Sequence, residues 1–251
     1  MSITFFGRAS SPADNSAKYA DPDTPLAIVP PASMLAGDFV YCVVNLRDPG
    51  TSVSNSTTGG QTWTAETAVV GGSGLLRAFW CTFNGTWSAN PEFTAAFRGT
   101  YAKFGISMQV FRPSGTPTWA VDVAQTDGYL VTAGAPYDVT AGNHTAIDSS
   151  TVTIATWVGW STYGGTMALQ SGGFTNPGGD TQYRNADGAI NGPDMVMSSA
   201  YKINSASGAV GAPVNRFSSD PTVGHWMVQT FKDQSAAASS SRKGFALLGV
   251  G

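Results

Sequence analysis

The stretch GDFVYCVVNL, from Gly37 to Leu46, decides the fold of this chain of 251 residues. Successive side chains of a β-strand point to opposite faces. One face of this stretch carries Val40, Cys42, Val44 and Leu46, and the other carries Phe39, Tyr41 and Val43. Because both faces are apolar, we expect a central strand covered on both sides, or a strand whose second face meets another subunit.

The rest of the chain carries the same strand signal. Charged residues make up only 12% of it, about half of the usual share of about 25%, and β-branched and aromatic runs alternate with Gly and Pro. No internal repeat of 20–50 residues is apparent. We therefore expect an all-β chain, a two-sheet antiparallel β-sandwich of the jelly-roll type, over residues 1–234. The further strands expected are Ile3–Arg8, Thr24–Pro30, Thr58–Val70, Gly74–Phe83, Pro91–Phe97, Lys103–Arg112, Thr118–Gln125, Thr151–Trp160, Asp194–Ile203, Ala212–Phe217 and Gly224–Phe231.

Charge and hydropathy argue against two classes of partner. The net charge is −3 and no basic stripe is present, so we expect no nucleic-acid partner. Apolar runs are shorter than the roughly 20 residues of a membrane span, so we expect no span. The start MSITFFGRASSPADN lacks a basic segment and a long apolar core, which predicts a protein made in a cytoplasm without a signal peptide. Cys42 and Cys81 lie within expected strands, as reduced core residues do.

Trp63 has two interpretations. It alternates with Thr62 and Thr64 in the expected strand Thr58–Val70, so its indole lies on one face and the threonines on the other. The indole is either a plug between two sheets or a platform on which a ligand stacks. The polar stretch that precedes this strand is expected to be a surface connection at one end of a sheet.

A second group of aromatic residues suggests a binding surface. Trp160 ends a strand, Tyr163 lies in a glycine-rich stretch, and Tyr183 and Arg184 follow in a long loop. Such side chains stack on sugar rings or fill protein interfaces, and packing within the core or between subunits is the alternative.

A metal site has weaker support. Asp180, Asn185 and Asp187 offer the hard oxygen ligands of a calcium site, although turn chemistry accounts for the same residues. The zinc spacing of Cys and His is missing. We expect no cofactor, with calcium as the alternative.

Catalytic patterns are weak in the sequence. Glu66 and Glu92 lie at strand ends without the spacing of a facing glycosidase pair. His144 and His225 are far apart along the chain, and no G-x-S-x-G motif is present. We expect His144 to be a solvated loop residue, His225 a packing residue, and the protein not to be an enzyme, with a glycan hydrolase or lyase as the alternative.

Residues 235–251 form a different kind of segment. Ser235–Ser241 is small and polar, which is typical of a flexible linker. Four apolar residues follow: Phe245, Leu247, Leu248 and Val250. We expect an assembly arm that adds a strand to a neighbouring subunit or to another protein, or else folds back on its own domain.

The stretch TPLAIVPPASMLAGDFVYCVVNLRDPGTSVSNSTTGGQTWT resembles a recurrent pattern of bacteriophage virion proteins from tails, fibres and head decorations. Its elements are an early strand (ITFFGRAS), P-x-x-x-x-x-G-D before an apolar strand (Pro31–Val44), and Gly60 before Thr62-Trp63. VMSSAYKINSASGAVGAPVNRF and GHWMVQTF continue it, so the likeness covers Ile3 to about Phe231.

The virion proteins of this pattern resemble concanavalin-like or laminin-G-like jelly rolls. The resemblance implies a structural component of the virion surface (a fibre, spike or decoration protein) that is made in the host cytoplasm. It further implies other virion proteins as partners, a homo-oligomer, with a trimer favoured, and a host-surface glycan as ligand. The alternative from another class is a carbohydrate-active enzyme or a free lectin with a concanavalin-like fold.

Overall fold

Antiparallel strands build all of the regular structure in the described residues. The computed structural model describes residues 2–11, 25–47, 52–72, 74–96, 103–115, 117–130, 136–161, 167–177, 181–183, 194–218 and 223–234. The predicted all-β class and the antiparallel β-sandwich are confirmed.

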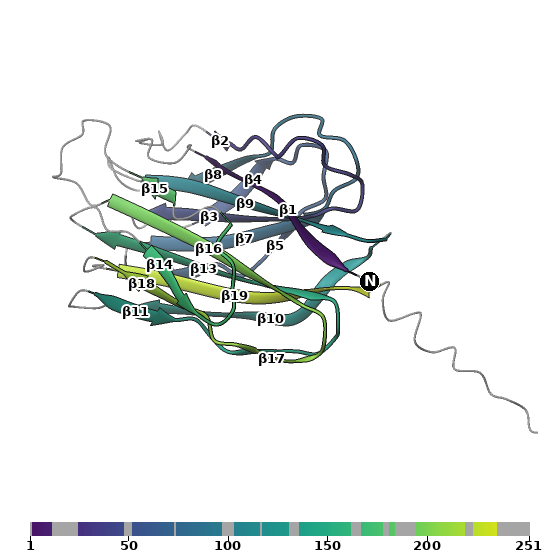
Figure 1. Ribbon diagram of the computed structural model, residues 1–251. Coiled ribbons are helices and arrows are strands. Elements are labelled where there is room, and N and C mark those ends of the chain that lie inside the picture. The colour runs from purple at the N-terminus through teal and green to yellow at the C-terminus, as the bar shows by residue number, and fades with distance from the viewer. Residues whose placement is uncertain are drawn as a thin grey trace, which may run out of the picture.

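Two large sheets face each other in the middle of the molecule (Figure 1). The first inner sheet has the order β1 (Ile3–Ser11), β9 (Lys103–Pro113), β3 (Phe39–Arg47), β7 (Gly74–Thr82) and β5 (Thr64–Ala65), with β6 (Val69–Gly71) also paired to β7. The second inner sheet has the order β10 (Trp119–Leu130), β19 (Val223–Asp233), β13 (Thr151–Ser161), β16 (Asp194–Asn204) and β15 (Thr181–Tyr183).

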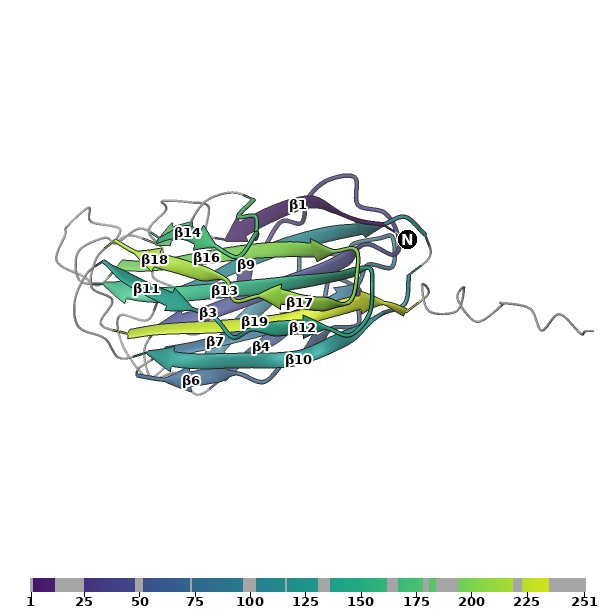
Figure 2. The same cartoon turned by 60° about the horizontal axis from the view of Figure 1, so that its bottom comes forward.

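Smaller sheets cover the outer faces of these two (Figures 1 and 2). The first outer sheet consists of β2 (Leu26–Ala27), β8 (Glu92–Ala96) and β4 (Ser52–Thr57). The second outer sheet consists of β11 (Tyr137–Thr140), β18 (Val214–Phe217) and β14 (Met167–Ser171), beside the pair β12 (His144–Ala146) and β17 (Gly208–Gly211). The two sheets expected from the sequence are thus the inner ones, and each has a layer of its own outside it.

Strand β3 has no exposed face. Its Phe39, Tyr41 and Val43 pack into the cluster between the inner sheets. Its alternate residues, Val40 and Cys42 among them, pack into the cluster under the first outer sheet. The first of the two expectations for this strand, a central strand covered on both sides, is confirmed, and both covers come from the same chain.

Strand β13 holds the same place in the second inner sheet. Val152, Ile154 and Val158 face the first inner sheet, whereas Ala155 and Trp157 face the second outer layer. Each half of the chain therefore has one central strand buried on both faces.

The first half of the chain, strands β1 to β9, and the second half, strands β10 to β19, share one topology. The path β1-β9-β3-β7 of the first inner sheet recurs as β10-β19-β13-β16 in the second, and the outer path β2-β8-β4 recurs as β11-β18-β14. In this correspondence the strands keep their order along the chain. The repeat unit is thus about half of the chain, well above the 20–50 residues of short sequence repeats.

The strand registers agree with this correspondence. Phe111 of β9 lies opposite Phe39, and Phe231 of β19 lies opposite Val152. Each phenylalanine meets an aromatic ring of the other half edge to face: Phe111 lies 5.2 Å from Tyr201, and Phe231 lies 5.5 Å from Trp80. The halves therefore pack through equivalent surfaces, as two copies related by a two-fold axis do.

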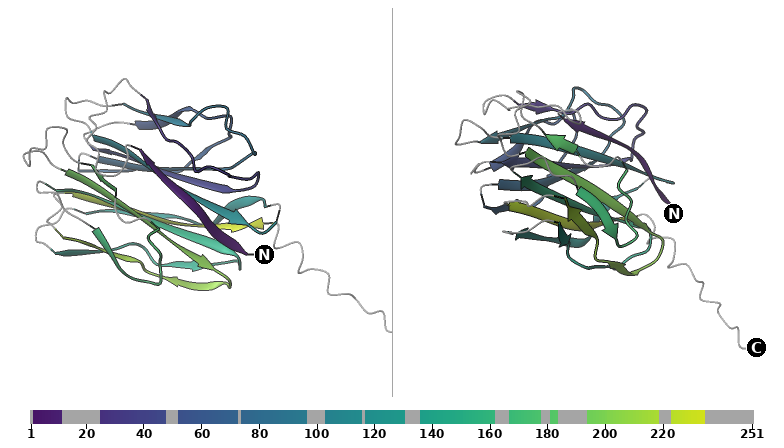
Figure 3. Two further views of the ribbon diagram at one scale, coloured as in Figure 1. Left: turned by 45° about the horizontal axis from the view of Figure 1, so that its top comes forward. Right: turned by 60° about the vertical axis from the view of Figure 1, so that its left-hand side comes forward.

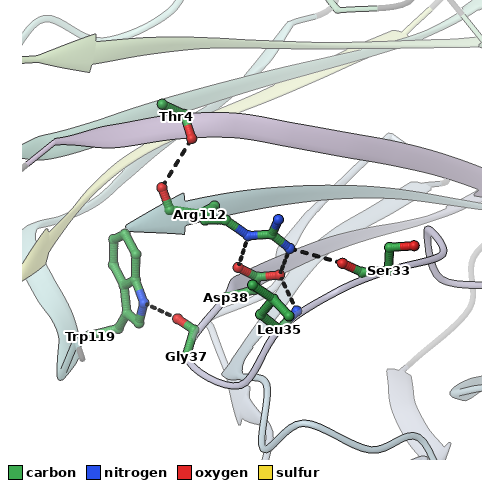
Figure 4. Close-up of polar contacts among 7 residues, drawn as sticks. All are labelled: Thr4, Ser33, Leu35, Gly37, Asp38, Arg112 and Trp119. Atoms are coloured by element: carbon green, nitrogen blue, oxygen red, sulfur yellow. Dashed lines mark hydrogen bonds and ion pairs between the residues drawn. The ribbon is translucent and has the colours of Figure 1, made fainter. Parts of the chain in front are cut away.

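A basic residue follows each of these phenylalanines and holds the loop that enters the central strand. Arg112 donates from Nε and Nη2 to the two carboxylate oxygens of buried Asp38, at 2.9 and 2.8 Å, and from Nη2 to the Ser33 carbonyl (Figure 4). Lys232 lies 2.5 Å from Asp148, in the loop before β13.

The contacts of Gly37 and Asp38 explain the G-D pair of the sequence pattern. Asp38 accepts the Leu35 amide. Gly37 has φ of +96°, a value that favours glycine, and a Cβ there would lie 2.9 Å from Pro117 Cδ. The Gly37 carbonyl accepts the indole N–H of Trp119, which ties the second half to this turn (Figure 4).

Both cysteines are buried free thiols on the outer face of the first inner sheet. The core position expected for Cys42 and Cys81 is confirmed. Burial raises the pKa of each thiol well above its usual value.

The start of β1 and the end of β19 lie at the same end of the sandwich (Figure 3). Nearby, Ser114 donates to the Ser2 carbonyl and Gln234 to the Thr118 carbonyl. The last described residue, Gln234, directly precedes the expected arm.

Candidate ligand-binding site

A surface depression opens where an edge of the first inner sheet meets an edge of the first outer sheet. Its volume is about 470 Å³. Strands β4 and β5 form the two edges (Figure 1). Its lining combines one indole, one guanidinium, amides and hydroxyls: Ser54, Asn55, Thr58, Gln61, Thr62, Trp63, Ala65, Arg77 and Phe79. This mixture of an aromatic platform and directed polar groups is typical of small-ligand sites.

Hydrogen bonds fix the loop that carries the indole. Gly59 and Gly60 take φ of +64° and +83°, which explains the paired glycines of the GGQTWT stretch. The Gln61 amide donates to the Thr86 carbonyl at 2.8 Å and to Asn84 Oδ1 at 3.1 Å, and its Oε1 accepts the Asn84 amide. The loop is therefore tied to residues 84–86 before any ligand arrives.

Trp63 combines parts of both interpretations that the sequence left open. Its indole N–H donates to the Thr58 carbonyl at 2.9 Å. The ring stacks on Trp87 at 6.3 Å and meets Phe93 edge-on at 6.0 Å, yet the side chain stays half-buried. It closes the gap between the two sheet edges and also lines the depression. Trp63 precedes β5 rather than lying within a long strand.

Arg77 is the charged group of the depression. Nε donates to the Glu66 carbonyl at 2.9 Å and Nη1 to the Val53 carbonyl at 2.8 Å. The guanidinium lies over Phe79, 5.2 Å from the ring centroid. These contacts hold the side chain across the two sheet edges.

The sequence interpretation did not select Arg77. A signal was present, because Arg77 is the one charged residue of the expected strand Gly74–Phe83. A lone charge within an apolar strand needs a partner.

The aromatic residues selected from the sequence lie elsewhere. Trp160 in β13 and Tyr183 in β15 both pair with Met195 of β16, so one cross-strand row contains both. Tyr163 and Arg184 lie outside the described residues. The register thus brings two of the four onto one row of the second inner sheet, away from the depression.

The other selected residues lie outside the described part of the chain. These are the calcium candidates Asp180, Asn185 and Asp187, and the arm residues Phe245, Leu247, Leu248 and Val250. Within the described part, no group of three or more His, Cys, Asp or Glu side chains is placed to hold a metal ion.

The histidines are both buried. The prediction that His144 is a solvated loop residue is wrong: its ring nitrogens lie 2.9 Å from Thr126 Oγ1 and 3.0 Å from Thr230 Oγ1, inside the second half. His225 packs 5.4 Å from Tyr129, as expected of a packing residue. Burial lowers the pKa of both rings, that of His225 to about 4.

The two glutamates bind neighbouring side chains. Glu66 Oε1 accepts the Trp80 indole N–H at 2.6 Å, and Glu92 Oε2 accepts the Thr57 hydroxyl at 2.8 Å. Both carboxylates therefore have a structural contact on the first half.

Comparison of the chain with protein-family models, curated proteins and solved structures found no match in any of the three. Among the described residues, no helix is long and apolar enough to cross a membrane.

Proposed function

We propose that this chain is a structural component of a phage particle, exposed on the virion surface as a fibre, spike or decoration protein, and that it binds a host-surface glycan in the depression beside Trp63. The depression is the observation that carries the binding part of this proposal. An indole held by its own N–H bond, with hydroxyls and a guanidinium around it, suits a sugar ring that stacks and also exchanges hydrogen bonds, accepting from the guanidinium.

The strand order supports the virion part. In each half the first strand pairs with the last and the last pairs with the central strand, β3 or β13, and the outer strands repeat this nesting. We interpret this order as that of a jelly roll, an architecture that viral capsid and lectin domains use. The resemblance of residues 3–231 to virion proteins supports the same assignment.

Partners are inferred from the resemblance. Other virion proteins and copies of the chain itself, with a trimer favoured, are the proposed partners. Strand β3 no longer argues for an oligomer, because sheets of the same chain cover both of its faces. Docking of the C-terminal arm with Phe245 and Leu248 is the proposed means of attachment.

A free lectin is the second candidate, because the depression needs no particle to bind a sugar. The two candidates differ in location, so the test images phage particles from the source culture after labelling with antibodies against this chain. A glycan array probed with the full chain and with its Trp63→Ala variant tests binding. We expect labelled particle surfaces and glycan signals that the variant loses. Unlabelled particles with retained glycan signals favour the free lectin, and glycan signals that persist in the variant exclude the depression.

A further inference from the structure

We infer that the ligand of the Trp63 depression is an anionic saccharide whose carboxylate or sulfate binds Arg77. This inference rests on the proposed function and specifies its ligand class.

The first argument is that Arg77 lacks a counter-ion. Three other basic side chains of the described part have one: Arg112 pairs with Asp38, Arg216 with Asp138, and Lys232 with Asp148. Arg77 instead donates to two backbone carbonyls, and no carboxylate of the described residues lies within ion-pair distance of it. A partly buried charge that is bonded only to neutral acceptors keeps most of its attraction for an anion.

The second argument is the orientation of the guanidinium. Nε and Nη1 are occupied on the protein side, whereas Nη2 has no hydrogen-bond partner among the described residues. Phe79 supports one face of the group. A planar guanidinium held in this way presents its remaining N–H groups in a fixed direction, as recognition of a carboxylate or a sulfate requires.

The third argument is that the acidic side chain of Glu66, whose backbone carbonyl Arg77 binds, is engaged elsewhere. Arg77 contacts Glu66 through its backbone carbonyl, while the Glu66 carboxylate binds Trp80 at 2.6 Å. The protein therefore does not neutralise Arg77 from the residue that lies beside it.

The fourth argument is that a stacking surface and hydroxyls share the depression with Arg77. Trp63 offers its half-buried ring, and Ser54, Thr58 and Thr62 are exposed beside it. A sugar that stacks on the indole and places an acidic group on Arg77 would use both ends of the depression.

The test probes a glycan array that carries neutral, carboxylated and sulfated oligosaccharides with the full chain. The strongest carboxylated ligand is then titrated by calorimetry beside its methyl ester, which differs only in charge. We expect acidic glycans to dominate and the methyl ester to bind roughly tenfold to a hundredfold more weakly, as loss of a charge-assisted hydrogen-bonded pair predicts. If sulfated ligands alone bind, the same titration compares the sulfated sugar with its desulfated form.

Three variants locate the effect. Arg77→Met keeps the aliphatic stem and should lose the preference for acidic over neutral ligands, while Arg77→Lys should recover part of it. Lys202→Met is the matched control, because Lys202 also donates only to backbone carbonyls, those of Gly172 and Val210, in the other half. It should bind as the wild type does. Circular dichroism verifies that each variant is folded.

The outcomes separate this inference from the proposed function. Neutral glycans that bind as well as acidic ones, or binding that is unchanged in Arg77→Met, would overturn the anionic ligand and leave glycan binding intact. No binding of any glycan by the folded wild type would overturn both.

Discussion

The two halves of the molecule have the same strand order, yet among the described residues their equivalent edge positions differ in burial. Thr64, next to Trp63, pairs with Trp80, and the equivalent pair in the second half is Thr175 with Tyr201. There the neighbour is Phe174, which is only 8% exposed and belongs to the core. The same position thus holds a half-buried tryptophan in one half and a core residue in the other.

The charged position differs in the same way. Arg77 lies opposite Val44, and the register places Ser198 of β16 at the equivalent point, opposite Trp157. Ser198 is buried and accepts a hydrogen bond from Asn176 at 3.1 Å. The comparison teaches that the repeated fold keeps edge-to-face aromatic contacts where the halves meet, whereas equivalent positions at the outer edges diverge toward an open depression or toward a closed core.

The outer layers differ in polarity as well. The layer under the first outer sheet is a continuous apolar cluster. Under β12 in the second half lies a buried polar group, in which His144 and Thr153 both contact the Thr230 hydroxyl, and Asn204 donates to Thr151 and Thr153. Because these hydrogen-bonded side chains are buried, the stability of the second half depends on the protonation state of His144.

The largest expected effect tests the equivalence of the inner faces. Phe111→Ala and Phe231→Ala each remove a fully buried ring with an edge-to-face contact across the halves. We expect each to lower the free energy of unfolding by about 3–5 kcal/mol, measured by urea denaturation. Costs that differ by more than about 2 kcal/mol would contradict equivalent packing of the two halves.

The next effect sharpens the contrast in polarity. Burial lowers the pKa of His225 to about 4, an effect partly offset by a hydrogen bond to Gly71 and by Asp127, against about 6.5 in the unfolded chain. As the pH falls, the unfolded chain binds a proton at this histidine at a higher pH than the folded protein does. The folded state therefore keeps its full stability above pH 6.5 and loses part of it as the pH falls toward 4. The loss amounts to about 3 kcal/mol for this residue, and His144, whose pKa is also lowered, adds to it.

Both histidines of the chain lie in the second half, so acid should weaken that half first. Hydrogen exchange at pH 5 should show lower protection in β13 and β19 than in β3 and β9, relative to the same strands at pH 7. The variant His225→Gln should flatten the dependence of stability on pH between 6.5 and 4.5. An unchanged pH dependence in this variant would assign the acid sensitivity to other groups.

The smallest effect concerns the edges themselves. Trp63→Ala should cost about 1–2 kcal/mol, because the ring is only half-buried and keeps part of its surface in water in the native state. Phe174→Ala, at the equivalent closed position, should cost about 3–4 kcal/mol. Thermal unfolding of the two variants compares them directly, and a Trp63 cost that matches that of Phe174 would make the indole a core residue rather than an open platform.

Long apolar strands were predictable from the sequence, and short edge strands were not. The stretches around β3, β7, β9, β13 and β19 carry enough β-branched and aromatic residues to dominate any local interpretation. Strand β4, the sequence SVSNST, was expected to be a surface connection. It pairs with β8 on one side only. An edge strand tolerates polar residues, so β4 lacks the apolar alternation by which a strand is recognised.

The duplication and the depression depend on contacts that single stretches do not show. The halves share strand order but few residues at equivalent points, as the pairs Phe39 with Val152 and Arg77 with Ser198 illustrate. Trp63 was selected from the sequence because a lone indole among threonines is conspicuous. Its relation to Arg77 needed the pairing of β5 with β7 and the approach of β4, which places Val53 at the guanidinium.

The burial of both thiols makes the wild-type chain suitable for selective chemical labelling. A maleimide reacts with an exposed thiolate, and the raised pKa values and full burial of Cys42 and Cys81 leave neither available in the folded protein. A cysteine introduced at one exposed position therefore becomes the single reactive thiol of the folded chain, and neither native cysteine has to be replaced. A fluorophore or a gold particle attached there would mark the orientation of the two halves wherever the protein is assembled.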